Sequence, residues 1–150
     1  MKIWLNNRIT DQGKARVSLF DRGFLYGDGV FETMRAYGGQ VFKADKHLDR
    51  LYRSLKITEI TIPYSRPFLK KQIYKLLKKN KLKEAYIRLA VTRGTGRIGL
   101  SRIECKNPTI AIVANKLTPY PEVMYKKGIS VKIACIRQNE NSPISGIKSL

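Results

Sequence analysis

Two consecutive segments carry apolar residues at helical spacing, and segments with the character of β-strands lie before and after them. The first begins near Asp45, which we expect to be the N-cap, and runs toward Lys56. The second follows a proline-containing break at 63–67 and ends near Asn80. Each has one apolar stripe to bury: Leu48, Leu51, Tyr52 and Leu55 in the first, and Leu69, Ile73, Leu76 and Leu77 in the second. A sheet can cover both stripes.

The flanking segments have strand spacing and turn signals. Asn6-Asn7 and Gly38-Gly39 are turn dipeptides, so each is expected to join two strands into a hairpin. The run at 109–113 is apolar enough for a strand covered on both faces, and residues 20–29 suit a turn or short helix. Strands are expected at 2–5, from 9 onward, and at 30–37, 40–42, 85–92, 108–114 and 129–136. Together these elements predict an α+β fold, a mostly antiparallel sheet with two helices on one face.

The chain is strongly basic, with 30 Lys and Arg against 11 Asp and Glu and a formal charge of +19. No acidic residue occurs at 60–83, where eight basic residues lie. Such a run attracts phosphate-rich partners, and a basic module that binds nucleic acid or another anion is therefore one interpretation. The lysines lie opposite the apolar stripe and only Tyr74 interrupts them, so a solvated helix face is the interpretation that we favour.

Several classes of protein and site are not supported. No stretch is apolar enough for a membrane helix, and the N-terminus turns polar too early for a secretory signal, so we expect a cytoplasmic protein without a membrane partner. Cys105 and Cys135 lie far apart and are expected to be buried, reduced thiols. The glycines at 94–99 have dinucleotide-motif spacing but no helix is predicted after them. His47 has no partners for a metal site, so none is predicted.

Four segments, in order, resemble the class IV, pyridoxal-phosphate-dependent aminotransferase family. They are residues 19–37 (LFDRGFLYGDGVFETMRAY), 47–51 (HLDRL), 86–88 (YIR) and 146–150 (GIKSL). The resemblance covers nearly the whole chain and implies that residues 1–118 form the family's N-terminal domain. Residues 119–150 would be the interdomain connector and the first strand of a second domain that supplies further cofactor contacts. We therefore expect little or no transamination from these 150 residues alone.

The resemblance implies pyridoxal 5'-phosphate as the cofactor. Lys148 would bind it covalently and then move the proton at the substrate α-carbon, a role that suits a tethered amine. Arg50 matches the arginine that binds the cofactor phosphate, for which a guanidinium offers paired hydrogen bonds. Without the resemblance, Lys148 reads as an exposed lysine and Arg50 as a surface residue paired with Asp49 or Asp45.

Four positions match the substrate pocket of branched-chain aminotransferases. They are Phe31, Arg35, Tyr86 and Arg88, of which the last two share a strand face because they are two residues apart. Tyrosine and arginine together bind a carboxylate beside an apolar wall. Without the family, these residues form an ordinary solvated sheet face with a core phenylalanine. Tyr26 resembles a residue donated across the interface of a homodimer.

The resemblance implies transfer of the amino group of a branched-chain L-amino acid to 2-oxoglutarate. Thr33 stands where branched-chain enzymes usually have glycine, and residues 91–95 are similar to D-amino acid aminotransferases. Those enzymes place an arginine and a histidine in the next loop, and here only Arg97 is present. Aminodeoxychorismate lyases share the segment around Lys148. Both relatives remain alternatives.

Overall fold

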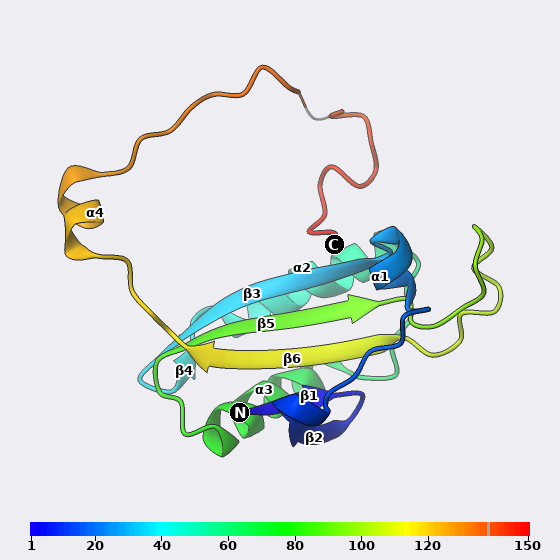
Figure 1. Cartoon of the computed structure of the whole chain (residues 1–150), viewed down its shortest axis with the longest axis horizontal. Coiled ribbons are helices and arrows are strands. Elements are labelled where there is room, and N and C mark those ends of the chain that lie inside the picture. The colour runs from blue at the N-terminus through cyan, green and yellow to red at the C-terminus, as the bar shows by residue number, and fades with distance from the viewer. Residues whose placement is uncertain (138) are drawn as a thin grey trace.

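The computed structural model describes residues 1–137 and 139–150. Its centre is a six-stranded sheet in which all pairings between strands are antiparallel and the order is β2-β1-β6-β5-β3-β4 (Figure 1). The strands are β1 (Lys2–Leu5), β2 (Arg8–Asp11), β3 (Gly29–Tyr37), β4 (Gln40–Val41), β5 (Ala85–Thr92) and β6 (Thr109–Lys116). Both predicted hairpins are confirmed, with Gly38 and Gly39 at positive φ in the second turn.

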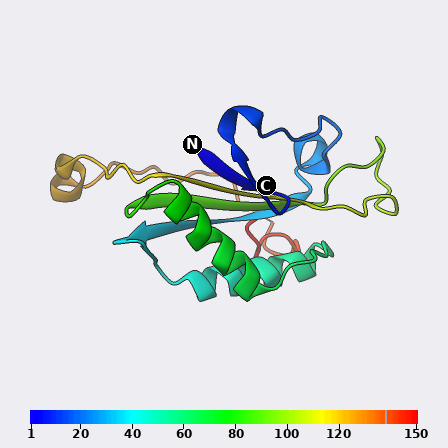
Figure 2. The same cartoon turned by 90° about the horizontal axis from the view of Figure 1, so that it is seen from below.

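Two long helices cover one face of this sheet, as Figure 2 shows. α2 (Ala44–Ile57) packs on β3, and α3 (Arg66–Lys79) packs on β1 and β6. The side chain of Ser65 accepts a hydrogen bond from the Phe68 N–H and starts α3. The prediction of Asp45 as the N-cap of α2 is wrong, because Lys43 takes that position at φ 48° and Asp45 lies in the first turn. The α+β fold class is confirmed.

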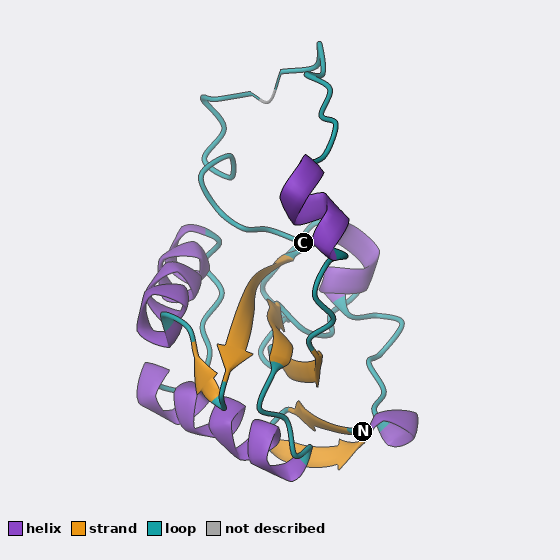
Figure 3. Ribbon diagram, turned by 90° about the vertical axis from the view of Figure 1, so that its left-hand side faces the viewer, coloured by secondary structure: helices purple, strands orange, loops and turns teal. Residues whose placement is uncertain are grey.

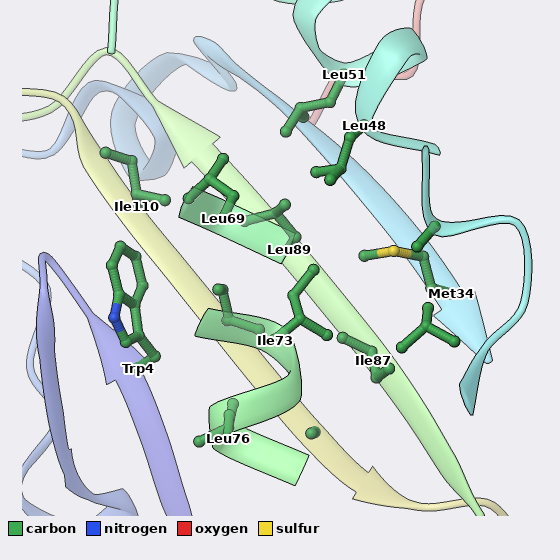
Figure 4. Close-up of a cluster of buried hydrophobic side chains, with 14 of the residues drawn as sticks. Trp4, Met34, Leu48, Leu51, Leu69, Ile73, Leu76, Ile87, Leu89 and Ile110 are labelled. Carbon is green, nitrogen blue, oxygen red and sulfur yellow. The ribbon is translucent and has the colours of Figure 1, made fainter. Parts of the chain in front are cut away.

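The core fills the space between the helices and the sheet (Figure 4). Alternate residues of each central strand point toward the helices, and the predicted helical stripes face them. Buried side chains include Trp4, Met34, Leu48, Leu51, Leu69, Ile73, Leu76, Ile87, Leu89 and Ile110. Tyr52 of the first stripe is only partly buried. Burial of this apolar area is the main favourable contribution to the stability of the fold.

The other face of the sheet is only partly covered by the described residues. In β6, Ile110, Ile112 and Ala114 are buried, while Ala111 and Val113 between them are half-buried. The prediction of a strand covered on both faces is therefore wrong for the described chain, because both long helices lie on the same side. α1 (Arg22–Tyr26) and the 3-10 turn Gln12–Lys14 are further short elements, and α1 confirms the short helix expected within 20–29.

Beyond β6 the described chain is mostly loop, as Figure 3 shows, with the single short helix α4 (Glu122–Lys127). The strand predicted at 129–136 is not formed: these residues are exposed and no described segment pairs with them. An alternating pattern forms a strand only where a partner satisfies its backbone. Cys135 is exposed and Cys105 half-buried, so the prediction that both are buried is wrong, although both are free thiols. Every helix among the described residues is too short or too polar to cross a bilayer.

Candidate functional site

The sheet face away from α2 and α3 carries the four residues predicted to line a substrate pocket. Phe31 and Arg35 of β3 point to this face because their neighbours Val30, Glu32 and Met34 point to the core. Tyr86 and Arg88 of β5 share it, since Ala85, Ile87 and Leu89 are buried. The register places Arg35 opposite Tyr86 and Thr33 opposite Arg88. Strand alternation thus brings the predicted residues onto one surface.

Lys148 reaches this surface through the C-terminal segment, which returns to the edge of β3 (Figure 1). The N–H of Phe31 donates to the Lys148 carbonyl at 3.0 Å, and the N–H of Leu150 donates to the Gly29 carbonyl at 3.0 Å. The Lys148 Nζ lies 5.1 Å from the centroid of the Phe31 ring, and the Arg88 Cζ lies 3.8 Å from the same centroid. One aromatic ring therefore contacts two cationic side chains.

The charge on this face is positive. Among the residues of β3, β5 and β6 the only acidic one is Glu32, which points to the opposite face. Lys148 and Arg88 therefore both lie beside the Phe31 ring without a carboxylate from these strands to compensate their charges. A carboxylate or phosphate is the kind of group that fits such a place, because lysine and arginine donate charge-assisted hydrogen bonds to both.

Arg50 lies on α2 and is fixed by a buried carboxylate. Its Nε and Nη2 donate to the two oxygens of Glu32 at 2.6 and 2.7 Å, and His47 Nδ1 lies 2.8 Å from the second oxygen. The alternative pairing of Arg50 with Asp49 or Asp45 is thus wrong. Burial on its own raises the pKa of Glu32, but the hydrogen bonds from Arg50 and His47 outweigh it and hold the pKa below its ordinary value.

The Arg50 guanidinium can donate further hydrogen bonds. Within the described residues its Nη1 makes no hydrogen bond, and its side chain is 45% exposed. It lines a small pocket of about 130 Å³ together with Gly146 and Ile147, which directly precede Lys148. The guanidinium is therefore held by Glu32 on one side and opens toward the C-terminal segment on the other.

Tyr26 is not joined to this group by any contact among the described residues. Its hydroxyl accepts a hydrogen bond from the Gly99 N–H at 2.8 Å, and the Arg22 guanidinium lies 4.7 Å from its ring centroid. The ring is 42% exposed and lines a separate pocket of about 390 Å³ with Ser149 and Leu150. Its predicted place at a dimer interface stays a prediction.

Two acidic residues that organise the site were missed by the sequence analysis. Glu32 is one, and its position between the buried Val30 and Met34 of β3 was the available signal. The other is Asp28, which accepts hydrogen bonds from Arg93 at 2.7 and 3.0 Å and from Arg22 at 3.1 Å. Burial raises the pKa of Asp28, but these two guanidinium groups lower it further than burial raises it. No group of three potential metal ligands occurs in 1–137 and 139–150.

The sequence model of the family described as amino-transferase class IV matches residues 29–150. The chain belongs to the class IV aminotransferase family. A relative from Methanocaldococcus jannaschii, provisionally named a branched-chain-amino-acid aminotransferase, is 44% identical over 138 residues, which are 92% of this chain and 47% of the relative. The aminodeoxychorismate lyase of Bacillus subtilis is 37% identical over 139 residues, covering 91% and 46%.

Other relatives have other names. The D-alanine aminotransferase of Listeria monocytogenes is 39% identical over 94 residues, which are 63% of this chain and 32% of that enzyme. Among solved structures, the branched-chain aminotransferase of Thermoproteus uzoniensis with norvaline aligns with a TM-score of 0.73 at 33% identity, over 82% of this chain and 43% of that chain. The 4-amino-4-deoxychorismate lyase of Pseudomonas aeruginosa aligns with a TM-score of 0.81 at 26% identity, over 99% and 52%. The chain spans about half the length of these relatives or less.

Proposed function

We propose that this chain forms the N-terminal half of a pyridoxal-phosphate-dependent transaminase that passes the amino group of a branched-chain L-amino acid to 2-oxoglutarate. The observation that carries the proposal is the placement of Lys148. Backbone pairing with β3 holds it beside Phe31, where its amine and the Arg88 guanidinium contact one ring on a face without strand carboxylates. Transamination of an amino acid requires an amine that can bind an aldehyde and, beside it, a cationic group that can bind the substrate carboxylate.

The donor set fits this cofactor. We assign Lys148 to hold its aldehyde carbon, and Arg50, with its Nη1 still available, to hold its phosphate. When bound, pyridoxal phosphate supplies an electron sink that makes the α-carbon proton of an amino acid removable. The Lys148 amine, once the substrate amine has displaced it from the aldehyde carbon, would be a free base still held beside the α-carbon by its backbone, and would remove the proton and return it. Glu32 fixes the guanidinium of Arg50 and thereby orients it.

The strand residues supply the substrate pocket in this proposal. Arg88 binds the substrate carboxylate through its guanidinium, and Tyr86 adds a hydroxyl donor from the same strand face. The Phe31 ring provides an apolar wall for the side chain. Arg35, opposite Tyr86 in the register, adds positive charge at the rim.

The substrate class rests on the family resemblance and the relatives. The names of the M. jannaschii relative and of the T. uzoniensis enzyme support a branched-chain substrate. Thr33 lies opposite Arg88 on the same face, so its methyl group narrows the pocket relative to glycine. The similarity to D-alanine aminotransferase and to aminodeoxychorismate lyases supports these activities as second candidates. We further propose a cytoplasmic homodimer in which Tyr26 meets the partner subunit.

A chimera tests this proposal. Residues 1–150 are joined to the part of the M. jannaschii relative that lies beyond the matched region, and amino-group transfer to 2-oxoglutarate is measured with L-leucine, L-valine and D-alanine. Cleavage of aminodeoxychorismate is assayed in parallel. We expect transfer from the branched-chain L-amino acids, abolished by Lys148→Ala and retained in Lys132→Ala, a change at an exposed lysine of the same segment.

Each outcome has a distinct meaning. Preferential turnover of D-alanine or aminodeoxychorismate would move the chain to the corresponding second candidate. A folded chimera whose residual activity is the same in the two lysine variants would contradict the role of Lys148 and with it the proposed function.

A further inference from the structure

A pocket of about 400 Å³ lies where α3 crosses the β1–β2 hairpin, and we call it the α3–hairpin pocket. Its lining consists of three lysines, two amides and two apolar residues: Lys2, Lys75, Lys79, Asn7, Gln72, Trp4 and Ile9. It lies on the helix-covered face, whereas Lys148 approaches the opposite face at β3. Two strands, β6 and β5, separate β1 from β3, which at the usual strand spacing is about 14 Å. The α3–hairpin pocket is thus distinct from the candidate active site.

The walls of this pocket are fixed to one another. The side chain of Asn80, just after α3, accepts from the Lys2 N–H at 2.8 Å and donates to the Lys2 carbonyl at 2.9 Å. Gln72, Lys75 and Lys79 are spaced so that all three lie on the side of α3 that faces the hairpin. The pocket is therefore part of the packed domain and does not depend on the long segment beyond β6.

The lining is cationic and contains no acidic residue. Lys2 is 2.7 Å from the Asp11 carboxylate, so its charge is partly compensated from outside the pocket. Lys75 and Lys79 form no ion pair with any residue in 1–137 and 139–150. Two uncompensated ammonium groups one helical turn apart attract an anion.

Two further donors in the lining lack partners. Gln72 is 8% exposed and Trp4 is 1% exposed, yet no hydrogen bond to the described residues is formed by the Gln72 amide or the Trp4 indole N–H. Every fully enclosed polar side-chain atom in the described chain does have a partner. The amide and the indole N–H are therefore not fully enclosed, and the α3–hairpin pocket is the hollow that both side chains line. An indole N–H can only donate, so it needs an acceptor.

We propose that the α3–hairpin pocket binds the phosphate group of a small phosphorylated molecule. A phosphate offers acceptor oxygens for the ammonium groups and for the neutral donors at once. The volume of the pocket exceeds that of a single phosphate and is in the range of small-molecule sites, so the ligand carries an organic part beside Ile9 and Trp4.

A nucleic-acid backbone is a poorer match for the same lysines. It is contacted on open surfaces by arginines, lysines and stacked aromatic rings, and it needs no donors at the bottom of a pocket. Here the only indole is almost wholly buried, and the neutral donors lie beneath the lysines. These features favour a small ligand over a polymer that tracks along α3.

Trp4 makes the test direct, because it is the only tryptophan in the chain. Its fluorescence is followed while the 150-residue chain is titrated with inorganic phosphate, with ribose 5-phosphate, and with a single-stranded RNA oligonucleotide at two salt concentrations. The double variant K75Q/K79Q removes the two uncompensated charges. The matched control K71Q/K78Q removes two exposed lysines of the same helix that do not line the pocket.

We expect saturable binding of ribose 5-phosphate with a change in Trp4 emission. K75Q/K79Q should weaken it by about tenfold or more, and K71Q/K78Q by less than about twofold. The inference is overturned if neither phosphate compound changes the emission, or if both double variants weaken binding equally. It is also overturned if only RNA binds, with a steep salt dependence. Circular dichroism of the variants confirms that each is folded. The inference does not depend on the proposed transaminase activity.

Discussion

Replacing Glu32 by glutamine is expected to destabilise the chain by about 2–3 kcal/mol at pH 7. Glu32 is fully buried and is held by two hydrogen bonds from Arg50 and one from His47. Removing one partner of a buried ion pair costs about 3–5 kcal/mol. The Arg50 side chain is 45% exposed, so water solvates it in the variant and the cost falls to the lower end of that range or slightly below.

The pH dependence of this difference follows from the pKa of Glu32. The pKa is lower in the folded chain than its ordinary value of 4.5, so the unfolded state binds the proton more readily. The contribution of the ionised carboxylate to stability is therefore complete above about pH 4.5 and is lost as the pH falls through the folded pKa. The Glu32→Gln variant has no carboxylate at this position and does not lose stability in this way. The difference in the free energy of unfolding between this variant and the unchanged chain therefore becomes smaller in acid.

Urea denaturation followed by circular dichroism measures both quantities, at pH 7 and at pH 3.5. Glu122→Gln is the control, because Glu122 is an exposed residue of α4 whose pair with Lys126 is also exposed. We expect that control to change the free energy of unfolding by less than about 0.5 kcal/mol. The reasoning is refuted if Glu32→Gln behaves like the control at pH 7, or if its deficit is the same at both pH values.

Three further predictions concern the core, a tight loop and the sheet face that carries Arg88. Leu69→Ala, at a fully buried side chain, should lower the free energy of unfolding by about 2–5 kcal/mol, whereas Leu100→Ala, at a side chain 87% exposed, should change it by less than about 0.5 kcal/mol. Gly94→Ala should lower the free energy of unfolding by more than about 2 kcal/mol, because Gly94 has φ +85° and an added Cβ would overlap a backbone carbonyl. Gly13→Ala, where an added Cβ meets open space, should not have this effect, and thermal melting compares the two variants. In the active chimera, Arg88→Lys should raise KM for the amino acid about tenfold with less effect on kcat, and an unchanged KM would contradict the carboxylate role.

Much of the fold is predictable because its signals are local. The apolar period of each helix and the alternation in β3 and β5 depend only on neighbouring residues and on which face is buried. The predictions that were wrong depend on pairing partners that are distant in the sequence. The pattern at 129–136 has no strand beside it, and Asp45 faces Lys70 of α3 at 2.8 Å instead of capping its own helix.

In the candidate site, too, local patterns predict some features and contacts between distant residues determine the others. Strand alternation was enough to predict that Tyr86 and Arg88 share a face, and it places Phe31 with them once the register is known. The position of the Arg50 side chain could not be predicted in this way, because it depends on Glu32, which lies 18 residues away in sequence. In the sequence, Glu32 is recognisable only as an acidic residue within a buried stripe. The return of Lys148 to β3 is a pairing of distant segments that no local pattern encodes.

The central claim is that Lys148 is the cofactor lysine, and chemical trapping tests it most directly. The chain is incubated with stoichiometric pyridoxal phosphate, reduced with borohydride and digested, and mass spectrometry locates the modified lysine. The structure predicts selective labelling of Lys148, lost in Arg50→Ala and kept in Arg8→Ala, a change at an exposed arginine of β2. Labels spread over the exposed lysines of α3, with Lys148 unmodified, would contradict it.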